Sequence, residues 1–235
     1  FDAFGFTSRT GVDLPSETGF MQYYKANQLG EVQLASSAFG QAMAITPLQM
    51  CTAVAAAVNG GYLVTPHVVD KITDANGNVI EEIGANVRRQ VISESTSNVI
   101  RQFMEYEVGA GTGGGKYAYV SGYRIGGKSG TSEQLNMDRR ADGDYKKVAS
   151  FAAVLPADDP EIIVYVMLDD PNNARTDYSS LLAAPVVGNI ISEIAPYLGI
   201  AADGEDRSQT VVTVPNLVGT EWSSAQVQLN IKGLR

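Results

Sequence analysis

The sequence predicts an α+β domain in which helices flank an antiparallel sheet. Three features lead to this prediction: a helix with recognisable signals at both ends, three strand-like runs in the second half of the chain, and an apolar helix after them. The 235 residues suffice for one large or two small domains. A hydrophobic content of 44% beside 18% charged residues is that of a globular protein with a real core.

The first firm element is a helix that begins after residue 46. Thr46 supplies an N-cap hydroxyl, Pro47 occupies the first helical position and Gln49 completes a capping box. The turn residues at 59–61 end the helix. Its expected buried face consists of Leu48, Cys51, Val54, Ala55 and Val58.

Less strongly marked elements lie on either side of this helix. Residues 1–34 are rich in glycine and turn residues, and a short helix is expected at 21–26. Residues 68–83 predict a β-hairpin, because Asn76-Gly77 can adopt the positive φ angles that a two-residue turn needs. A second helix, capped by Ser93 or Ser95, follows. Its apolar stripe is expected to pack in the core and consists of Val99, Ile100, Phe103, Met104 and Val108.

The strand-like runs occupy residues 117–130, 148–156 and 161–170. The second and third are joined by the turn sequence ADDP, which indicates consecutive antiparallel strands. A final helix is expected from about Pro185 to Leu198, with Pro196 kinking its last turn. This helix is expected to bury Val186, Val187, Ile190, Ile191 and Ile194.

Composition argues against several classes of function. A net charge of −9, with scattered basic residues, disfavours nucleic acid as a partner. The single cysteine, Cys51, excludes an internal disulfide or a cysteine metal cluster and is interpreted as a buried thiol. The single histidine, His67, is assigned a local role at a strand start, so neither a Ser-His-Asp triad nor a metal site is expected. No cofactor is predicted. The sequence contains no uninterrupted run of about eighteen apolar residues, so no transmembrane helix is predicted.

One stretch, GYRIGGKSGTSEQ at 122–134, fits two different chemistries. Residues 122–129 match the phosphate-binding pattern GxxxxGK[ST]. That mechanism requires a helix to begin at the lysine, so that its amides meet the phosphates. The residues after Lys128 offer only Leu135 and Met137 as apolar positions, so no helical face is expected there. The phosphate-loop interpretation is therefore disfavoured.

Interpreted as a strand, the same residues form a coherent site. Ser129 and Thr131 then lie on one face, and Lys128 and Gly130 on the other. Two adjacent hydroxyls can hold a carboxylate, and Gly130 allows an extended peptide to approach the strand edge. An N–H beside Thr131 would face a developing oxyanion. A cation at Lys128 would attract the carboxylate and support proton movement.

The tetrapeptide KSGT at 128–131 resembles the third motif of the penicillin-binding serine transpeptidases, whose signature is SxxK, then SxN, then K[ST]G. The resemblance extends over about residues 1–200 and is to the C-terminal half of class B penicillin-binding proteins of Gram-positive type. The tail, with VPNLVG at 214–219, resembles the opening of a PASTA module, a wall-associated extracellular domain. The segments that carry the main resemblance are FGFTSRTGVDLPSE (4–17), residues 36–69, GTGGGKYAYVSGYRIGGKSGTSE (111–133) and residues 148–171.

The resemblance implies a role for each residue of the motif. Lys128 would lie in the active-site cleft, and the backbone N–H of Thr131 would be half of the oxyanion hole. Ser129 and Thr131 would hold the terminal carboxylate of a D-Ala-D-Ala stem peptide or a β-lactam. The expected catalytic residues are thus Lys128 and Thr131, and the expected substrate-binding residues are Ser129, Gly130, Thr131 and Ser132.

Two of the family's motifs are missing. No serine lies three residues before a lysine or two residues before an asparagine, so the chain has neither SxxK nor SxN. The nucleophilic serine, its lysine base and the second-motif serine are therefore expected upstream of Phe1 in a longer protein, and the chain alone is expected to be inactive. Glu133 stands where many relatives carry glutamine, which is expected to weaken the binding of anionic β-lactams.

The leading hypothesis is a D,D-transpeptidase that cross-links peptidoglycan through a serine acyl-enzyme during division or sporulation. It would be anchored at the extracellular face of the cytoplasmic membrane by a segment absent from this chain. Residues 1–200 would be the C-terminal part of its transpeptidase domain, 201–210 a linker and 211–235 the start of a PASTA-like module. Expected partners are peptidoglycan stem peptides, β-lactams, the upstream part of the same protein and cell-wall assembly proteins. The alternatives are a β-lactamase or β-lactam sensor, a non-catalytic cell-wall-binding scaffold, and a phosphate-loop ATPase.

Overall fold

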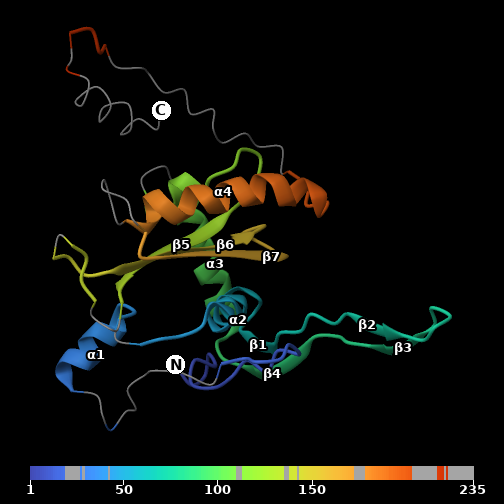
Figure 1. Ribbon diagram of the computed structural model, residues 1–235. Coiled ribbons are helices and arrows are strands. Elements are labelled where there is room, and N and C mark those ends of the chain that lie inside the picture. The colour runs from blue at the N-terminus through green and yellow to red at the C-terminus, as the bar shows by residue number, and fades with distance from the viewer. Residues whose placement is uncertain are drawn as a thin grey trace.

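The computed structural model describes residues 1–18, 27, 30–41, 43–109, 113–134, 138–141, 143–171, 178–202, 216–219 and 221. The helix expected at 21–26 lies outside the described residues, as do most of the expected linker and most of the PASTA-like segment. The α+β prediction is confirmed. Figure 1 shows a central sheet of β5, β6 and β7, with α4 on one face and α2 and α3 toward the other.

The central sheet is fully antiparallel, in the order β5 (Gly126–Glu133), β6 (Lys147–Leu155) and β7 (Ile162–Asp169). The register between β5 and β6 is unbroken from Gly126 opposite Val154 to Glu133 opposite Lys147. β6 and β7 pair from Val148 opposite Asp169 to Leu155 opposite Ile162, which confirms that the two runs joined by ADDP are consecutive antiparallel strands.

The first strand begins later than the expected residue 117. Residues Gly114–Ala118 instead form a short 3-10 helix, η2. Ala118 is fully buried and packs closely against α4. The approach is so close that a Cβ added at Gly188 of that helix would lie only 3.3 Å from the Ala118 Cα. Close packing between two distant segments thus decides the local structure here.

Helix α4 (Ser179–Tyr197) covers one face of the sheet and begins six residues before the expected start at Pro185. Val187 and Ile191 are fully buried as predicted, whereas Val186 is 40% exposed, so its predicted burial was wrong. By length and composition alone α4 is apolar enough to cross a membrane. Its buried side chains pack on the sheet, however, which is how a core helix of a globular domain behaves.

The core lies between α4 and the sheet. Phe151 of β6 is its largest fully buried side chain and is surrounded by residues of several elements. These include Val108 from α3 (Glu94–Gly109), Ile125 just before β5, and Val164 on β7. Burial of one such aromatic side chain away from water contributes about 1.5–3 kcal/mol to the stability of the folded state. The position of β5 is therefore tied to the packing of this core.

Helix α2 (Pro47–Val58) begins with the predicted capping box. The Gln49 N–H donates to Thr46 Oγ1 at 3.1 Å, and the Thr46 N–H donates to Gln49 Oε1 at 2.9 Å. Of the predicted buried face only Val58 is buried, and the other four assignments were wrong. The buried residues are Gln49, Thr52, Ala53, Ala56 and Val58, while Leu48, Cys51, Val54 and Ala55 are half-buried.

The N-terminal segment explains why Gln49 is buried. Gln49 is only 2% exposed, and its amide nitrogen donates to the Ser8 carbonyl at 2.8 Å. A polar residue is therefore buried because the chain that precedes the helix returns to cover it. Within that segment, the Glu17 carboxylate accepts hydrogen bonds from the Thr10 N–H at 2.6 Å and the Thr10 hydroxyl at 2.7 Å.

Helix α3 is capped by Ser93, whose hydroxyl accepts from the Thr96 N–H at 3.1 Å. Of its predicted core stripe only Val108 is buried. Val99 is 46% exposed and Phe103 is 70% exposed, so these two assignments were wrong for this chain. Among the described elements α3 packs against β5, η2 and α2, and these contacts leave Val99 and Phe103 exposed.

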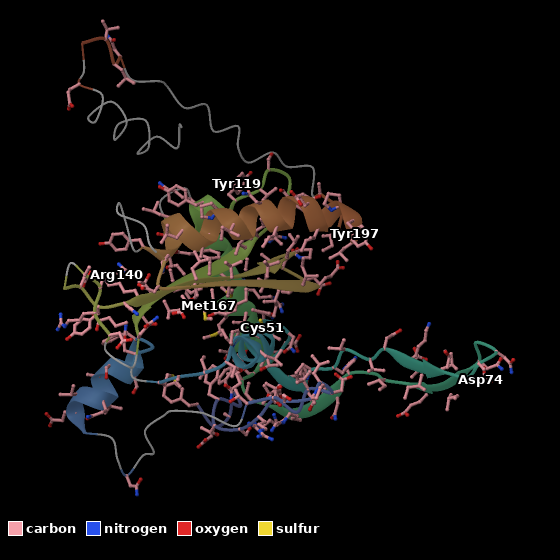
Figure 2. All side chains as sticks on the ribbon, viewed as in Figure 1. Cys51, Asp74, Tyr119, Arg140, Met167 and Tyr197 are labelled. Carbon is pink, nitrogen blue, oxygen red and sulfur yellow. The ribbon has the colours of Figure 1, made fainter. Side chains whose placement is uncertain are left out.

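Two smaller strand pairs extend from the body of the fold. β1 (Tyr62–Thr65) pairs with β4 (Asn86–Gln90), and β2 (Lys71–Thr73) pairs with β3 (Val79–Glu82) as the predicted hairpin. The predicted two-residue turn was wrong, because Gly77 takes a positive φ but Asn76 does not, and the Gly77 N–H donates to the Asp74 carbonyl at 3.1 Å in a longer turn. This hairpin projects away from the central sheet (Figure 1), and Asp74 of its turn is labelled in Figure 2. A further helix, α1 (Glu31–Ala38), was not predicted, and none of its residues is buried.

Candidate active site on the edge of strand β5

Residues 126–133 form a strand, which contradicts the phosphate-loop interpretation. A phosphate-binding loop needs a helix that begins at the lysine, whereas Lys128 lies inside β5. Ser129 pairs with Phe151, and Thr131 pairs with Ala149, across the β5–β6 ladder. The stretch is therefore one edge of the central sheet, because only β6 pairs with β5 among the described residues.

The hydrogen-bond register determines which backbone groups of β5 point away from the sheet. Gln134, which continues the register beyond the strand, donates its N–H to the Lys146 carbonyl at 2.9 Å. In an antiparallel ladder alternate residues point toward the partner strand. The even-numbered residues of β5 therefore direct their N–H and C=O groups toward β6. Ser129 and Thr131 direct theirs toward the free edge, where a substrate could pair with them.

The two faces of β5 carry the motif side chains as the alternation predicts. Ser129 lies on the face of Phe151, which packs under α4, and Thr131 reaches the first residue of α4. Lys128, Gly130 and Ser132 lie on the opposite face by the period of two. The Lys128 side chain is exposed, and its ammonium donates to the Ser129 carbonyl at 2.8 Å. Because that carbonyl points to the free edge, the Lys128 charge also lies at that edge.

The Thr131 hydroxyl is held by α4. It donates to Ser179 Oγ at 3.0 Å and accepts from the Ser179 backbone N–H at 3.2 Å. Ser179 is the first residue of the helix and is only 3% exposed. This contact joins residues 48 positions apart. Ser179 was not among the predicted site residues, because the helix was expected to begin at Pro185.

Charged side chains fix both ends of β5. Before the strand, Arg124 donates two hydrogen bonds to Glu105 of α3, at 2.7 and 2.8 Å, and also contacts Asp158. After it, Arg140 pairs with Asp170 at 2.7 Å. Figure 2 shows Arg140 near the end of the sheet where β5 and β6 are connected. A bidentate arginine pair adds directional rigidity as well as charge attraction, so these contacts restrict how far β5 can shift.

The single cysteine and histidine lie away from this edge. Cys51 is on α2, beneath the sheet face that carries Met167 (Figure 2), and burial raises the pKa of its thiol. His67 is exposed and lies between β1 and β2, so the expectation that it starts a strand was wrong. Among the described residues no three His, Cys, Asp or Glu side chains gather as a metal site.

These features define an open strand edge that carries a lysine and two hydroxyls on an α+β domain. Residues 1–192 match the family described as the penicillin binding protein transpeptidase domain. The chain belongs to this family, the penicillin-binding transpeptidases.

The individual relatives carry related names. Stage V sporulation protein D of Bacillus subtilis is 36% identical over 97% of this chain and 36% of the relative. The probable peptidoglycan D,D-transpeptidase FtsI of Caulobacter vibrioides is 33% identical over 78% of this chain and 30% of the relative. This chain thus spans about a third of the length of these curated relatives.

A solved structure supports the same assignment. Penicillin binding protein 3 from Mycobacterium tuberculosis, complexed with ampicillin, superposes with a TM-score of 0.71 and 28% identity. The match covers 87% of this chain and 46% of that protein. The fold of the described residues is therefore that of part of a penicillin-binding protein.

Proposed function

We propose that this chain is the C-terminal part of the transpeptidase domain of a class B penicillin-binding protein, a serine D,D-transpeptidase of peptidoglycan synthesis. The observation that carries the proposal is the placement of KSGT on an open strand edge, with the Thr131 N–H directed outward. Relatives named as D,D-transpeptidases favour this activity over that of a β-lactamase or a β-lactam sensor.

The reaction follows from the proposed roles. A serine hydroxyl from the upstream part of the protein attacks the carbonyl carbon of the penultimate D-Ala and passes its proton to a lysine base. The oxyanion formed accepts a hydrogen bond from the Thr131 N–H. The C–N bond to the last D-Ala then breaks, and that residue leaves as the amine with the proton. An amine of a neighbouring peptidoglycan strand then attacks the ester carbonyl and gives up a proton to the lysine base, which returns it to the serine oxygen as the C–O bond of the ester breaks.

The residues of β5 recognise the end of the stem peptide in this scheme. Its terminal carboxylate accepts hydrogen bonds from the Ser129 and Thr131 hydroxyls, and the Lys128 ammonium attracts it. Gly130 and Ser132 lie on the other face of β5 and are proposed to border the same substrate-binding edge. A side chain at Gly130 would narrow the approach to this edge. A β-lactam carries a carboxylate in a similar place, and the ampicillin complex of the related penicillin binding protein 3 supports β-lactam binding here.

The upstream part of the same protein is the proposed partner of the exposed surface on α3. Tyr106 and Phe103 are each 70% exposed, which is an unusual environment for two neighbouring aromatic side chains on a helix. We place the SxxK and SxN motifs in that part, together with the membrane anchor that would hold the protein at the outer face of the cytoplasmic membrane. The PASTA-like assignment of 211–235 remains a prediction.

The test is acylation of the full-length protein by a fluorescent penicillin. Thr131→Val removes the hydroxyl but keeps the backbone N–H, and it should slow acylation roughly tenfold to a hundredfold, as expected for a lost hydrogen bond to a charged group. Lys128→Ala should slow it further. Matched controls are Thr73→Val and Lys71→Ala on the distant β2–β3 hairpin, which should label at the wild-type rate.

Two results would refute the assignment of the site. One is labelling at the wild-type rate by both the Lys128 and the Thr131 variants. The other is absence of SxxK and SxN from the sequence upstream of Phe1, which would leave a non-catalytic scaffold. Rapid hydrolysis of the acyl-enzyme by water would instead identify a β-lactamase.

A further inference from the structure

Two hydrogen bonds join Thr131 of β5 to Ser179 of α4, and Ser179 has no role in the proposed reaction. Ser179 contributes two groups to this contact: a backbone N–H that donates to Thr131 Oγ1 at 3.2 Å and a hydroxyl oxygen that accepts from Thr131 at 3.0 Å. With 3% of its surface exposed, Ser179 has little access to water that could replace Thr131.

The same contact completes the start of α4. The first N–H groups of a helix have no partner inside the helix. Tyr178 occupies the N-cap position of α4, but its side chain makes no capping hydrogen bond. The Thr131 hydroxyl therefore serves as an acceptor for the first turn of a helix that is distant in sequence. Its side-chain orientation on β5 is fixed as a result.

The hydroxyl proton of Thr131 has two alternative acceptors in a working site. In the free protein Thr131 gives this proton to Ser179 Oγ. A hydroxyl has one proton and two lone pairs. When Thr131 turns its proton to a substrate carboxylate, the Ser179 hydroxyl can rotate and donate to Thr131 Oγ1. Thr131 then accepts two hydrogen bonds and donates one, so every group remains satisfied.

We propose that Ser179 is a positioning residue for Thr131, and that its hydroxyl becomes the donor to Thr131 when Thr131 binds the carboxylate of a stem peptide or β-lactam. This inference rests on the proposed function of Thr131. Ser179 itself does not touch the substrate. It orients the Thr131 hydroxyl and strengthens it as a donor, because a hydroxyl that accepts hydrogen bonds donates more strongly.

The experiment measures the second-order rate of acylation by a fluorescent penicillin in the full-length protein. Ser179→Ala should slow acylation about twofold to tenfold, the range for one neutral hydrogen bond. The decisive comparison is with Thr131→Val, where the hydroxyl that Ser179 acts upon is gone. In that background Ser179→Ala should have no further effect on acylation, whereas a purely structural effect would persist.

Two additional variants complete the design. Ser180→Ala removes the neighbouring hydroxyl, whose side chain lies beside Gly114 rather than Thr131, and should leave the rate unchanged. Ser179→Cys keeps the size of the side chain but replaces the hydroxyl with a weak donor, so it should slow acylation even if the alanine variant does not fold.

The outcomes separate this inference from the proposed function. If Thr131→Val slows acylation but Ser179→Ala has the same effect in the wild type and in the Thr131→Val background, the role of Ser179 is overturned while the proposed function stands. The same holds if Ser179→Ala has no effect in either background. Acylation of Ser180→Ala that is as slow as that of Ser179→Ala also overturns this role. Unchanged acylation by both Thr131→Val and Lys128→Ala overturns the proposed function and this inference with it. Loss of the Ser179→Ala effect in the Thr131→Val background supports the inference.

Discussion

Gly127, which directly precedes KSGT, is the point where β5 approaches the core most closely. An added Cβ at this position would lie 2.5 Å from Phe151 Cε1, 2.7 Å from Phe151 Cζ and 3.1 Å from Val108 Cγ2. Carbon atoms pack best at about 3.5–4.0 Å, so the Phe151 ring would have to withdraw by roughly 1 Å. We therefore expect Gly127→Ala to destabilise the protein through overpacking alone.

The magnitude follows from the burial of Phe151. This ring has no exposed surface and cannot swing into solvent, so the strain must be shared with the core around it. Overpacking of this kind costs about 1–3 kcal/mol. For domains of this size, 1 kcal/mol corresponds to a fall in melting temperature of about 2–4 °C. Gly127→Ala should therefore lower the melting temperature by about 2–12 °C.

Thermal unfolding of the full-length protein tests this expectation. Gly130→Ala on the same strand is the matched control, because its nearest neighbour would be the small, rotatable Ser150 hydroxyl at 3.0 Å. Phe151→Leu removes the two ring atoms, Cε1 and Cζ, that an added Cβ at residue 127 would meet. It should therefore lower the melting temperature less in the Gly127→Ala background than in the wild type. The reasoning is refuted if Gly127→Ala melts with the wild type, or if the penalties of the two substitutions simply add.

Two further predictions concern the N-terminal half. Gly61→Ala should destabilise the protein by about 3 kcal/mol or more, because φ is +96° and the added Cβ would lie 2.0 Å from the Ile92 carbonyl oxygen. Gly77→Ala, at φ +86° with open space around it, should cost only about 1–2 kcal/mol, and equal losses in denaturant unfolding would contradict this. Burial raises the pKa of Glu17, but hydrogen bonds from Thr10 outweigh it and hold that pKa below its ordinary value of 4.5. The ionised Glu17 carboxylate therefore stabilises the folded state at pH values above 4.5, and this stabilisation is lost as the pH falls through the lowered pKa of the folded state. Between about pH 6 and about pH 2, Glu17→Gln should lose less stability than the wild type. Parallel losses would show that this carboxylate does not contribute.

The sequence by itself was enough to predict the features that depend on neighbouring residues. The capping box of Thr46 and Gln49 formed because both partners lie within one helical turn. The short ADDP connection placed β6 against β7. The Asn76-Gly77 sequence correctly predicted that β2 pairs with β3, although the turn between them is longer than the two residues expected. Alternation along a strand was also sufficient to place Ser129 and Thr131 on one face, since the period of two does not depend on what the strand packs against.

The tertiary structure decided the features that depend on distant segments. Periodicity showed that α2 and α3 have apolar faces, but Gln49 became buried because Ser8 lies over it, and Phe103 remained exposed because no described segment covers it. The early start of α4 and the hydrogen bonds between Thr131 and Ser179 arose in the same way. Ser179 has no local signal for its role, because its partner lies 48 residues earlier and meets it only when α4 packs on the sheet.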